Sequence, residues 1–323
     1  MIHESLARER ERSHADFLRC LSPFKRALIW SLSRLFMVCF RKRWRLSVEH
    51  IERSSLQLRG ERARRLARCA LEQLGLTVID AVTRSLRLDN RVIEVSGETL
   101  RDRLCVLRER GVCIEGLERL LTAFNAGRGV VVVSAHLGAW EDLMRLGQWL
   151  GRPVYVISKQ MKSRLAQHLW DRSRRQAPAR LDRGARGRIA AKTLRSGGVI
   201  ADVLDQHDPR PRAITLNFLG REAQTSGDLA RLALMSDALI VPLFLLRGDV
   251  GIEGQRCEAK EGAQASRLSL LVGDVIDARD YRELPHSEAV KAISQSCLHN
   301  IERAILRAPE QWMWLHRRWK PRQ

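Results

Sequence analysis

The chain has 323 residues, of which 45% are hydrophobic, so it can bury the core of one large or two small domains. Lys and Arg total 57 against 37 Asp and Glu, and the formal charge of +20 predicts an anionic partner: nucleic acid, an anionic membrane surface or an acidic protein. The seven cysteines are scattered without Cys-x-x-Cys spacing, which argues against a zinc site and for free thiols in a reducing compartment.

The first apolar segment of the chain lies near the N-terminus. Residues 27–40 are only fourteen and include Arg34, whereas a membrane-spanning helix needs roughly 20 apolar residues. Basic residues flank this segment at both ends. One helical face carries Leu28, Leu32, Leu35, Phe36 and Cys39. We expect an amphipathic helix at 24–40 that lies in the membrane interface; an ordinary core helix and a true span remain the alternatives.

Helical patterns dominate up to about residue 110, and strands alternate with helices after it. The sequence therefore predicts a helical N-terminal region at 1–110 and an α/β domain at 111–323. We expect the domain to hold a central, mainly parallel or mixed sheet flanked by helices.

The stretch 129–143 carries the strongest chemical signal. Val130–Val133 is a continuous β-branched run, typical of a strand buried on both faces. His136 follows where the strand ends, and open α/β sheets bind ligands at that edge. Gly138 permits a tight turn, which can return Glu141 to the imidazole. A carboxylate on one ring nitrogen makes the other a better base, so His136 and Glu141 are the candidate catalytic pair; the alternative is a purely structural pair.

Two later strands also end in polar residues. Residues 153–158 form a predicted strand that leads to Lys159, which is either a cation for a phosphate or an exposed strand-end residue. Residues 199–204 form another, followed by Asp205 and Gln206. Asp205 is a candidate to bind acceptor hydroxyls or to hold a basic side chain; the alternative is a purely structural residue.

The C-terminal twelve residues are dense in aromatic and basic side chains. They include Trp312, Trp314 and Trp319 together with Arg317, Arg318, Lys320 and Arg322. One interpretation is a set of aromatic rings at a lipid interface, with Arg317 and Arg318 binding phosphate. The other is a terminal segment that packs its tryptophans on the core.

Several of these blocks resemble one known family. The segment His136-Leu-Gly-Ala-Trp-Glu141 resembles the His-x4-Asp/Glu motif of the lysophospholipid acyltransferase superfamily. The fuller match is to the His-Phe-Gly-Asn-Trp-Glu core of the bacterial lipid A late acyltransferases, the lauroyl and myristoyl transferases. Leu137 and Ala139 depart from that core. The Asp205-Gln206 block, the loop 218–227 and the terminal Gln311-Trp-Met-Trp-Leu-His-Arg-Arg-Trp319 also resemble the family.

The resemblance implies a glycerol-3-phosphate acyltransferase-like fold, an N-terminal membrane segment and a place at the cytoplasmic face of the bacterial inner membrane. It implies transfer of a fatty acyl chain to a hydroxyl of a lipid A precursor or related glycolipid, which is a phosphorylated acceptor. The donor would be a thioester of acyl carrier protein, an acidic partner, or of CoA. No cofactor and no metal are expected. The chain has no Gly-x-Ser-x-Gly motif, so direct attack with His136 as base is favoured over an acyl-enzyme.

The substrate-binding candidates are thus Lys159, Asp205, Gln206, Arg317 and Arg318. A lysophospholipid, an ornithine lipid or a secondary metabolite remains an alternative acceptor. The competing class is a basic nucleic-acid-binding protein, although no helix-turn-helix or zinc pattern is found and nucleic acid is not the expected partner.

Overall fold

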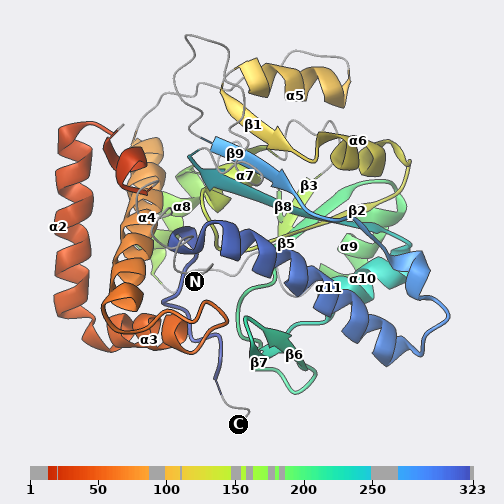
Figure 1. The fold of residues 1–323 in the computed structure, drawn as a ribbon. Helices are drawn as coiled ribbons and strands as arrows, with labels where there is room; N and C mark the ends of the chain where they lie inside the picture. Colours follow the sequence, from red (N-terminus) through yellow and green to blue (C-terminus); the bar gives the residue numbers. More distant parts are fainter. Residues whose placement is uncertain are drawn as a thin grey trace.

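A computed structural model describes residues 14–19, 21–86, 99–109, 111–146, 154–157, 163–173, 179–181, 186–248 and 268–320. Within these residues the fold is mixed α/β, with helices packed around one large sheet (Figure 1). A smaller hairpin lies below it, at the side where the chain ends in Figure 1. The prediction of an α/β fold with a central, mostly parallel sheet is confirmed.

The main sheet has the strand order β1-β9-β8-β2-β5-β3-β4, with β10 beside β8. β2 runs parallel to both of its neighbours, β5 and β8, and β9 is antiparallel to β8. The strands are β1 (Val112–Glu115), β2 (Val130–Ser134), β3 (Val154–Ile157), β4 (Ala179–Leu181), β5 (Val199–Val203), β8 (Leu239–Arg247), β9 (Leu268–Val272) and β10 (Ile276–Asp277). The antiparallel hairpin consists of β6 (Ile214–Phe218) and β7 (Arg221–Thr225).

Helices cover both faces of the sheet, and the valines of β2 divide between them. Val131 and Val133 face the core shared with α9 (Arg186–Arg195), α10 (Asp228–Ser236) and α11 (His286–Arg307). Val130 and Val132 face the core shared with α5 (Leu100–Glu109) and α6 (Leu117–Asn125). The remaining helices of the α/β part are α7 (Trp140–Leu146) and α8 (Arg164–Ser173). Every residue of β2 is buried, which explains its unbroken β-branched run.

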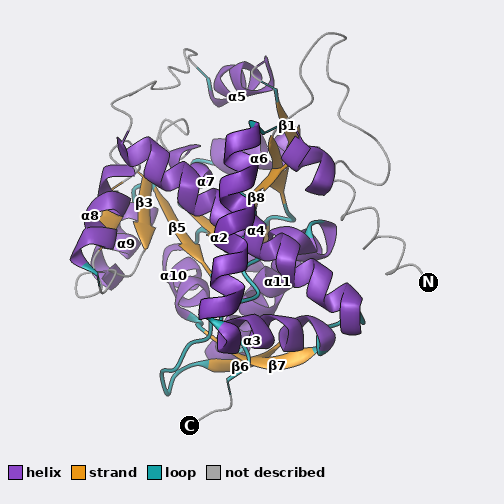
Figure 2. Cartoon of the chain, turned by 90° about the vertical axis from the view of Figure 1, so that its left-hand side faces the viewer, coloured by secondary structure: helices purple, strands orange, loops and turns teal. Residues whose placement is uncertain are grey.

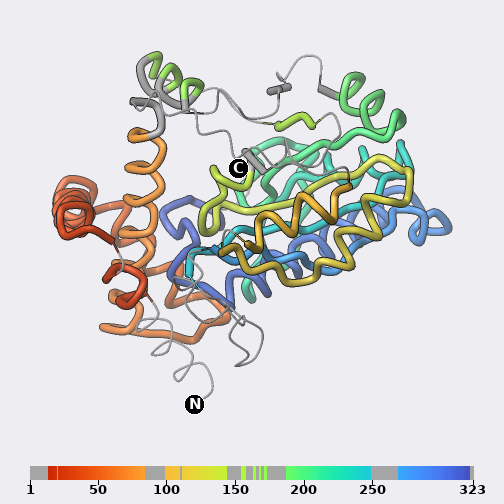
Figure 3. The backbone as a smooth tube through the Cα atoms, turned by 90° about the horizontal axis from the view of Figure 1, so that it is seen from above, coloured from red at the N-terminus to blue at the C-terminus, as the bar shows by residue number. Residues whose placement is uncertain are grey.

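Helices α2 (Pro23–Cys39), α3 (Arg41–Glu52) and α4 (Gly60–Leu86) precede α5 and gather at one side of the sheet (Figures 1 and 3). Ile51 of α3 and Leu66 of α4 belong to the same core as Val131. Helices α3 and α4 therefore share the hydrophobic core of the sheet, whereas α2 packs on α4. The division at residue 110 stays a prediction.

Helix α2 lies on the outside of α4 and faces the viewer in Figure 2. It is the helix expected at 24–40. Ile29 is buried against Leu76 and Ile79 of α4, whereas Phe24, Leu35 and Val38 are 79%, 59% and 64% exposed. None of the described helices combines the length and the hydropathy that a membrane crossing requires.

One smaller expectation, that the cysteines are free thiols, changes in part. Cys39, Cys69, Cys105 and Cys297 are free thiols, as expected, but Cys113 is disulfide-bonded.

Candidate functional site

His136 stands at the carboxyl end of β2, and the strand register explains its partner. Ser134 of β2 pairs with Val203 of β5 in parallel register. Two residues beyond each member of that pair lie His136 and Asp205, so the two side chains meet at the same edge of the sheet. His136 Nδ1 lies 2.9 Å from Asp205 Oδ1, and the backbone N–H of His136 donates to Asp205 Oδ2 at 3.0 Å. One carboxylate thus fixes both the backbone and the ring of His136.

Asp205 is 2% exposed and is itself held by a third group. Trp312 Nε1 donates to Asp205 Oδ2 at 2.8 Å. With both oxygens occupied, the carboxylate cannot rotate freely, so it holds the imidazole with the Nδ1 proton toward Asp205. Nε2 is then the ring nitrogen that can act as a base.

The pKa values of the pair move in opposite directions. Burial disfavours the His136 imidazolium, but the charge and hydrogen bond of Asp205 outweigh it, and the negative charge of Glu141 adds to them; the net effect raises the pKa of His136. Burial would raise the pKa of Asp205, but the interactions with His136 and Trp312 hold it well below its usual range. The pair therefore favours a carboxylate beside an imidazole of increased basicity.

Gln206 lies against the imidazole ring of His136. Its side-chain Nε2 is 3.2 Å from His136 Nε2 and 3.4 Å from His136 Nδ1. The His136 side chain is 19% exposed, and Gln206 is exposed on the surface, so this contact lies on the solvent-accessible side of the buried pair.

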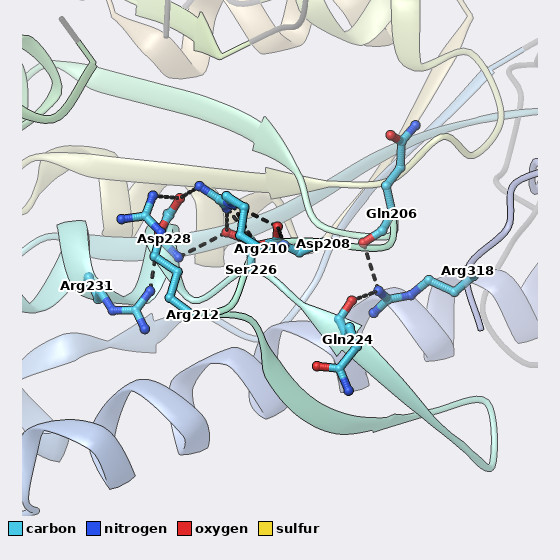
Figure 4. A network of polar contacts seen from close by, with 9 residues as sticks. All are labelled: Gln206, Asp208, Arg210, Arg212, Gln224, Ser226, Asp228, Arg231 and Arg318. Atoms are coloured by element: carbon cyan, nitrogen blue, oxygen red, sulfur yellow. Dashed lines mark hydrogen bonds and ion pairs between the residues drawn. The ribbon is translucent and has the colours of Figure 1, made fainter. Parts of the chain in front are cut away.

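A buried arginine fixes the backbone that carries Asp205 and Gln206. Arg318 is 0% exposed, and its Nη1 donates to the backbone carbonyls of Gln206 and Gln224, each at 2.7 Å. Its Nη2 donates to Thr225 Oγ1 at 2.7 Å. In Figure 4 the guanidinium meets the Gln206 carbonyl, while the Gln206 side chain points the other way. Arg318 therefore ties the loop after β5 to the hairpin.

The same loop is anchored again a few residues later. Asp208, 7% exposed, binds the guanidinium of Arg210 at 2.6 Å, and Arg210 reaches Asp228 at the start of α10 at 2.7 Å. Arg212 and Arg231 contact the same Asp228 carboxylate (Figure 4). The loop that delivers Gln206 is thus attached to both the hairpin and α10.

The turn after His136 is held by the end of β8, the other strand beside β2, and by the C-terminal segment. Gly138 has φ +63°, and a Cβ atom there would collide with the Leu245 carbonyl, so only glycine fits this turn. Arg247, at the end of β8 and 5% exposed, donates from Nη1 to the Gly138 carbonyl at 2.8 Å and from Nη2 to Thr77 Oγ1 of α4 at 2.9 Å. The Gln311 carbonyl accepts the Gly138 N–H at 3.1 Å. Arg247 was missed in the sequence, although it is the lone charge in an otherwise apolar strand.

Comparison with known proteins decides the family. Residues 65–321 match the model of the bacterial lipid A biosynthesis acyltransferases. The chain belongs to this family. It is accordingly an acyltransferase of the lipid A type in general. No curated protein matches the sequence. The matched segment contains His136, Asp205, Gln206 and Arg318.

In the folded acyltransferase, some of the site residues expected from the sequence lie together and others lie apart. His136, Asp205 and Gln206 form one cluster. Glu141, expected to orient the ring, is 4% exposed at the start of α7, and it acts on His136 through its charge, while Asp205 is the carboxylate bonded to Nδ1. Lys159 lies outside the described residues.

The two terminal arginines of the acyltransferase differ in position. Arg317 is exposed at the surface, where a phosphate can reach it. Arg318 is fully buried and bonded to protein groups, so phosphate cannot reach its guanidinium; here the sequence-based expectation needs correction.

The terminal tryptophans also separate. Trp312 and Trp314 are each 1% exposed and belong to the core, as the packing alternative predicted. Trp314 Nε1 donates to the Pro309 carbonyl at 2.8 Å, and Trp312 Nε1 donates to Asp205 Oδ2. Trp319 is partly buried against the same core.

Away from the His136 site, one group of described residues could supply three metal ligands whose atoms all lie within 4.8 Å of one another: His14, Cys69 and Glu72. His14 Nε2 lies 2.8 Å from Glu72 Oε2, and its Nδ1 lies 3.1 Å from the Gln73 amide nitrogen. Both ring nitrogens thus already have partners. Burial disfavours the charged form of His14, but the hydrogen bonds and charges of Cys69 and Glu72 outweigh burial and raise the pKa of His14 to about 10.

Proposed function

We propose that this acyltransferase moves a fatty acyl chain from a thioester to a hydroxyl of a lipid A precursor or related glycolipid, with His136 as the general base. The observation that carries the proposal is the hydrogen-bonded pair of His136 and Asp205. Nδ1 is bound to a buried carboxylate, while Nε2 lies 3.2 Å from an exposed, replaceable side chain. This arrangement supplies a base of fixed tautomer at an accessible position.

The proposed reaction is a direct transfer. The acceptor hydroxyl takes the place of the Gln206 amide at His136 Nε2 and gives up its proton there as its oxygen attacks the thioester carbonyl. A C–O bond forms, the C–S bond breaks, and the imidazolium returns the proton to the departing thiolate. Asp205 stabilises the imidazolium, and Glu141 adds negative charge at longer range.

Gln206 has a second use in this scheme. Once the acceptor displaces its amide from Nε2, the side chain stays within reach of the reacting carbonyl, because its backbone is fixed by Arg318. We assign it the role of a donor to the developing oxyanion.

The proposed donor is acyl carrier protein or CoA. Both are anionic, and the chain carries a formal charge of +20. The proposed location is the cytoplasmic face of the bacterial inner membrane, with α2 lying in the interface. The exposed Phe24, Leu35 and Val38 support this location, since such large apolar side chains favour a lipid surface.

The test is a transfer assay with acyl carrier protein thioester and a lipid A precursor in mixed micelles, repeated with acyl-CoA. The His136→Ala variant should lose about 10²–10⁴-fold in kcat, the usual effect of removing a general base. His299→Ala, which changes an exposed histidine of α11, is the matched control. Near-native turnover by the His136 variant would refute the mechanism, and activity only with an acceptor of another class would refute the substrate assignment.

A further inference from the structure

A cavity of about 330 Å³ lies between α2 and α4. Its walls include Trp30, Ser33 and Arg34 of α2 and Arg68 and Glu72 of α4. None of these residues belongs to the His136 site.

One side of this cavity is basic. Arg34 stacks over the Trp30 ring, with its guanidinium carbon 4.0 Å from the ring centroid. Within the described part of the chain, neither Arg34 nor Arg68 has a carboxylate partner, and both are exposed. Both guanidinium groups are therefore available to bind an anion.

The third polar wall residue has an unmet hydrogen bond. Ser33 is 3% exposed, and its Oγ has no partner within the described structure. Leaving a buried hydroxyl unpaired costs free energy, so a ligand or water that bonds to it is favoured. The fourth, Glu72, would repel an anion, but its carboxylate is paired with His14 at 2.8 Å.

The remaining walls and the surroundings are apolar. Met37 and Val38 complete the lining. Val38 is 64% exposed and Leu35, one turn before it, is 59% exposed, so the cavity borders the apolar face of α2. A ligand with an anionic head and hydrocarbon chains matches both parts at once.

We propose that the cavity between α2 and α4 binds the phosphate headgroup of an anionic membrane phospholipid, with Arg34, Arg68 and Ser33 as its ligands and the acyl chains along the exposed apolar face of α2. The occupant is a lipid of the bilayer, distinct from the acceptor at His136. Bound in this way, it would hold the enzyme on the membrane at a defined depth.

The test compares binding of the full chain to vesicles of pure phosphatidylcholine and to vesicles that also contain phosphatidylglycerol. The double variant Arg34→Gln, Arg68→Gln should bind the mixed vesicles at least 20-fold more weakly, at about five-fold per arginine near an anionic surface. The control Arg64→Gln, Arg65→Gln removes two exposed cations from the same helix α4, where they lie near Glu61. This control variant should bind the mixed vesicles at most about five-fold more weakly than the unchanged protein, a quarter of the 20-fold loss expected for the site variant.

Ser33→Ala gives an independent arm. It should weaken binding to the mixed vesicles without lowering the melting temperature, since the hydroxyl has no partner to lose. Glycerol phosphate in solution should not compete at concentrations where the vesicles saturate. If circular dichroism shows that the site variants are misfolded, the double variant Arg34→Lys, Arg68→Lys replaces them. It keeps both charges and should lose less of its binding to the mixed vesicles.

Equal losses in the site and control variants would overturn the proposal in favour of diffuse charge attraction. If the site variant bound the vesicles normally but no longer bound duplex DNA, the proposal would be overturned in favour of a nucleic-acid site. Competition by free glycerol phosphate would show a soluble phosphate site and would overturn the lipid assignment. All these measurements are independent of acyl transfer, so failure of the proposed function would leave them intact.

Discussion

His136 and Asp205 are joined by two hydrogen bonds, from the ring Nδ1 at 2.9 Å and from the backbone N–H at 3.0 Å. They come from neighbouring parallel strands and stand two residues beyond a register pair, Ser134 and Val203. The geometry is thus set by the sheet and not by a flexible loop. Positions directly after two paired strands favour the small tolerances that the proposed proton transfer requires.

The pair predicts the pH dependence of transfer. Asp205 raises the pKa of His136 above its ordinary value, which is about 6.5. A base must be neutral to accept a proton, so kcat/KM should rise with pH through this raised pKa and its acid limb should lie above pH 6.5. A pH–rate profile with a saturating donor checks this. A midpoint below the ordinary histidine value would contradict the role of Asp205.

Replacing the two carboxylates one at a time should separate their roles. Asp205→Asn removes the charge and leaves one acceptor oxygen for the three donors that Asp205 now serves, so it should lower kcat by about 10²–10⁴-fold and move the acid limb to lower pH. Glu141→Gln removes only a more distant charge and should move the limb less. Both variants need a melting curve. A larger effect of Glu141→Gln on the profile would make Glu141 the orienting carboxylate instead.

The sequence could predict the fold because β2 and β8 are apolar along nearly their whole length, as strands buried on both faces must be. It also placed His136, Asp205 and Gln206 at strand ends. It could not determine which carboxylate meets His136, because that depends on which strand neighbours β2. Glu141 is close in sequence, whereas Asp205 becomes the neighbour only through the β2–β5 pairing.

The C-terminal segment shows a different limit. Its aromatic and basic residues fit a lipid interface as well as a buried clamp, since composition does not report burial. Trp312 and Arg318 are buried because the segment turns back beneath the end of the sheet, where Leu137 pairs with Trp312 in an isolated bridge. Sequence spacing carries no signal for such a long-range contact.

Arg318 and Arg317 should behave differently when changed. Arg318→Ala removes the buried donor to the Gln206 carbonyl and to Thr225 Oγ1, and one of the donors to the Gln224 carbonyl, which also accepts the Asp208 N–H; it should therefore reduce the free energy of unfolding by about 2–4 kcal/mol. Arg317→Ala should leave the melting temperature nearly unchanged and, if it binds acceptor phosphate, raise only the acceptor KM. Chemical denaturation and both KM values check the pair. Unchanged stability of the Arg318 variant would refute its role as a clamp.

The proposed contact of α2 with a membrane can be tested at the exposed apolar face of this helix. Leu35→Glu with Val38→Glu should reduce membrane recovery strongly, because a charge placed in the lipid interface opposes insertion of the helix. Met235→Glu, at a residue of α10 that is 56% exposed, is the matched control. Fractionation of cell extracts measures both. Equal loss in the two variants would exclude α2 as the contacting surface.

Arg247 should act as a positioning residue for His136. Its guanidinium joins the Gly138 carbonyl to Thr77 of α4, and its backbone N–H and C=O each bond the Gln311 side chain at 2.8 Å. Arg247→Met keeps the backbone bonds but removes those of the side chain. The turn after His136 would then lose its link to α4.

We expect Arg247→Met to lower kcat by about 10²-fold, the scale of a small displacement of a catalytic group, with little change in the donor KM. The free energy of unfolding should fall by about 3 kcal/mol, because the Gly138 carbonyl becomes a buried, unpaired acceptor. Arg247→Lys should recover part of both, since an ammonium can still reach one oxygen. Arg282→Gln, at an exposed arginine, is the control. If the folded Arg247→Met enzyme turned over at the native rate, with only its stability reduced, Arg247 would serve packing alone and not the position of His136.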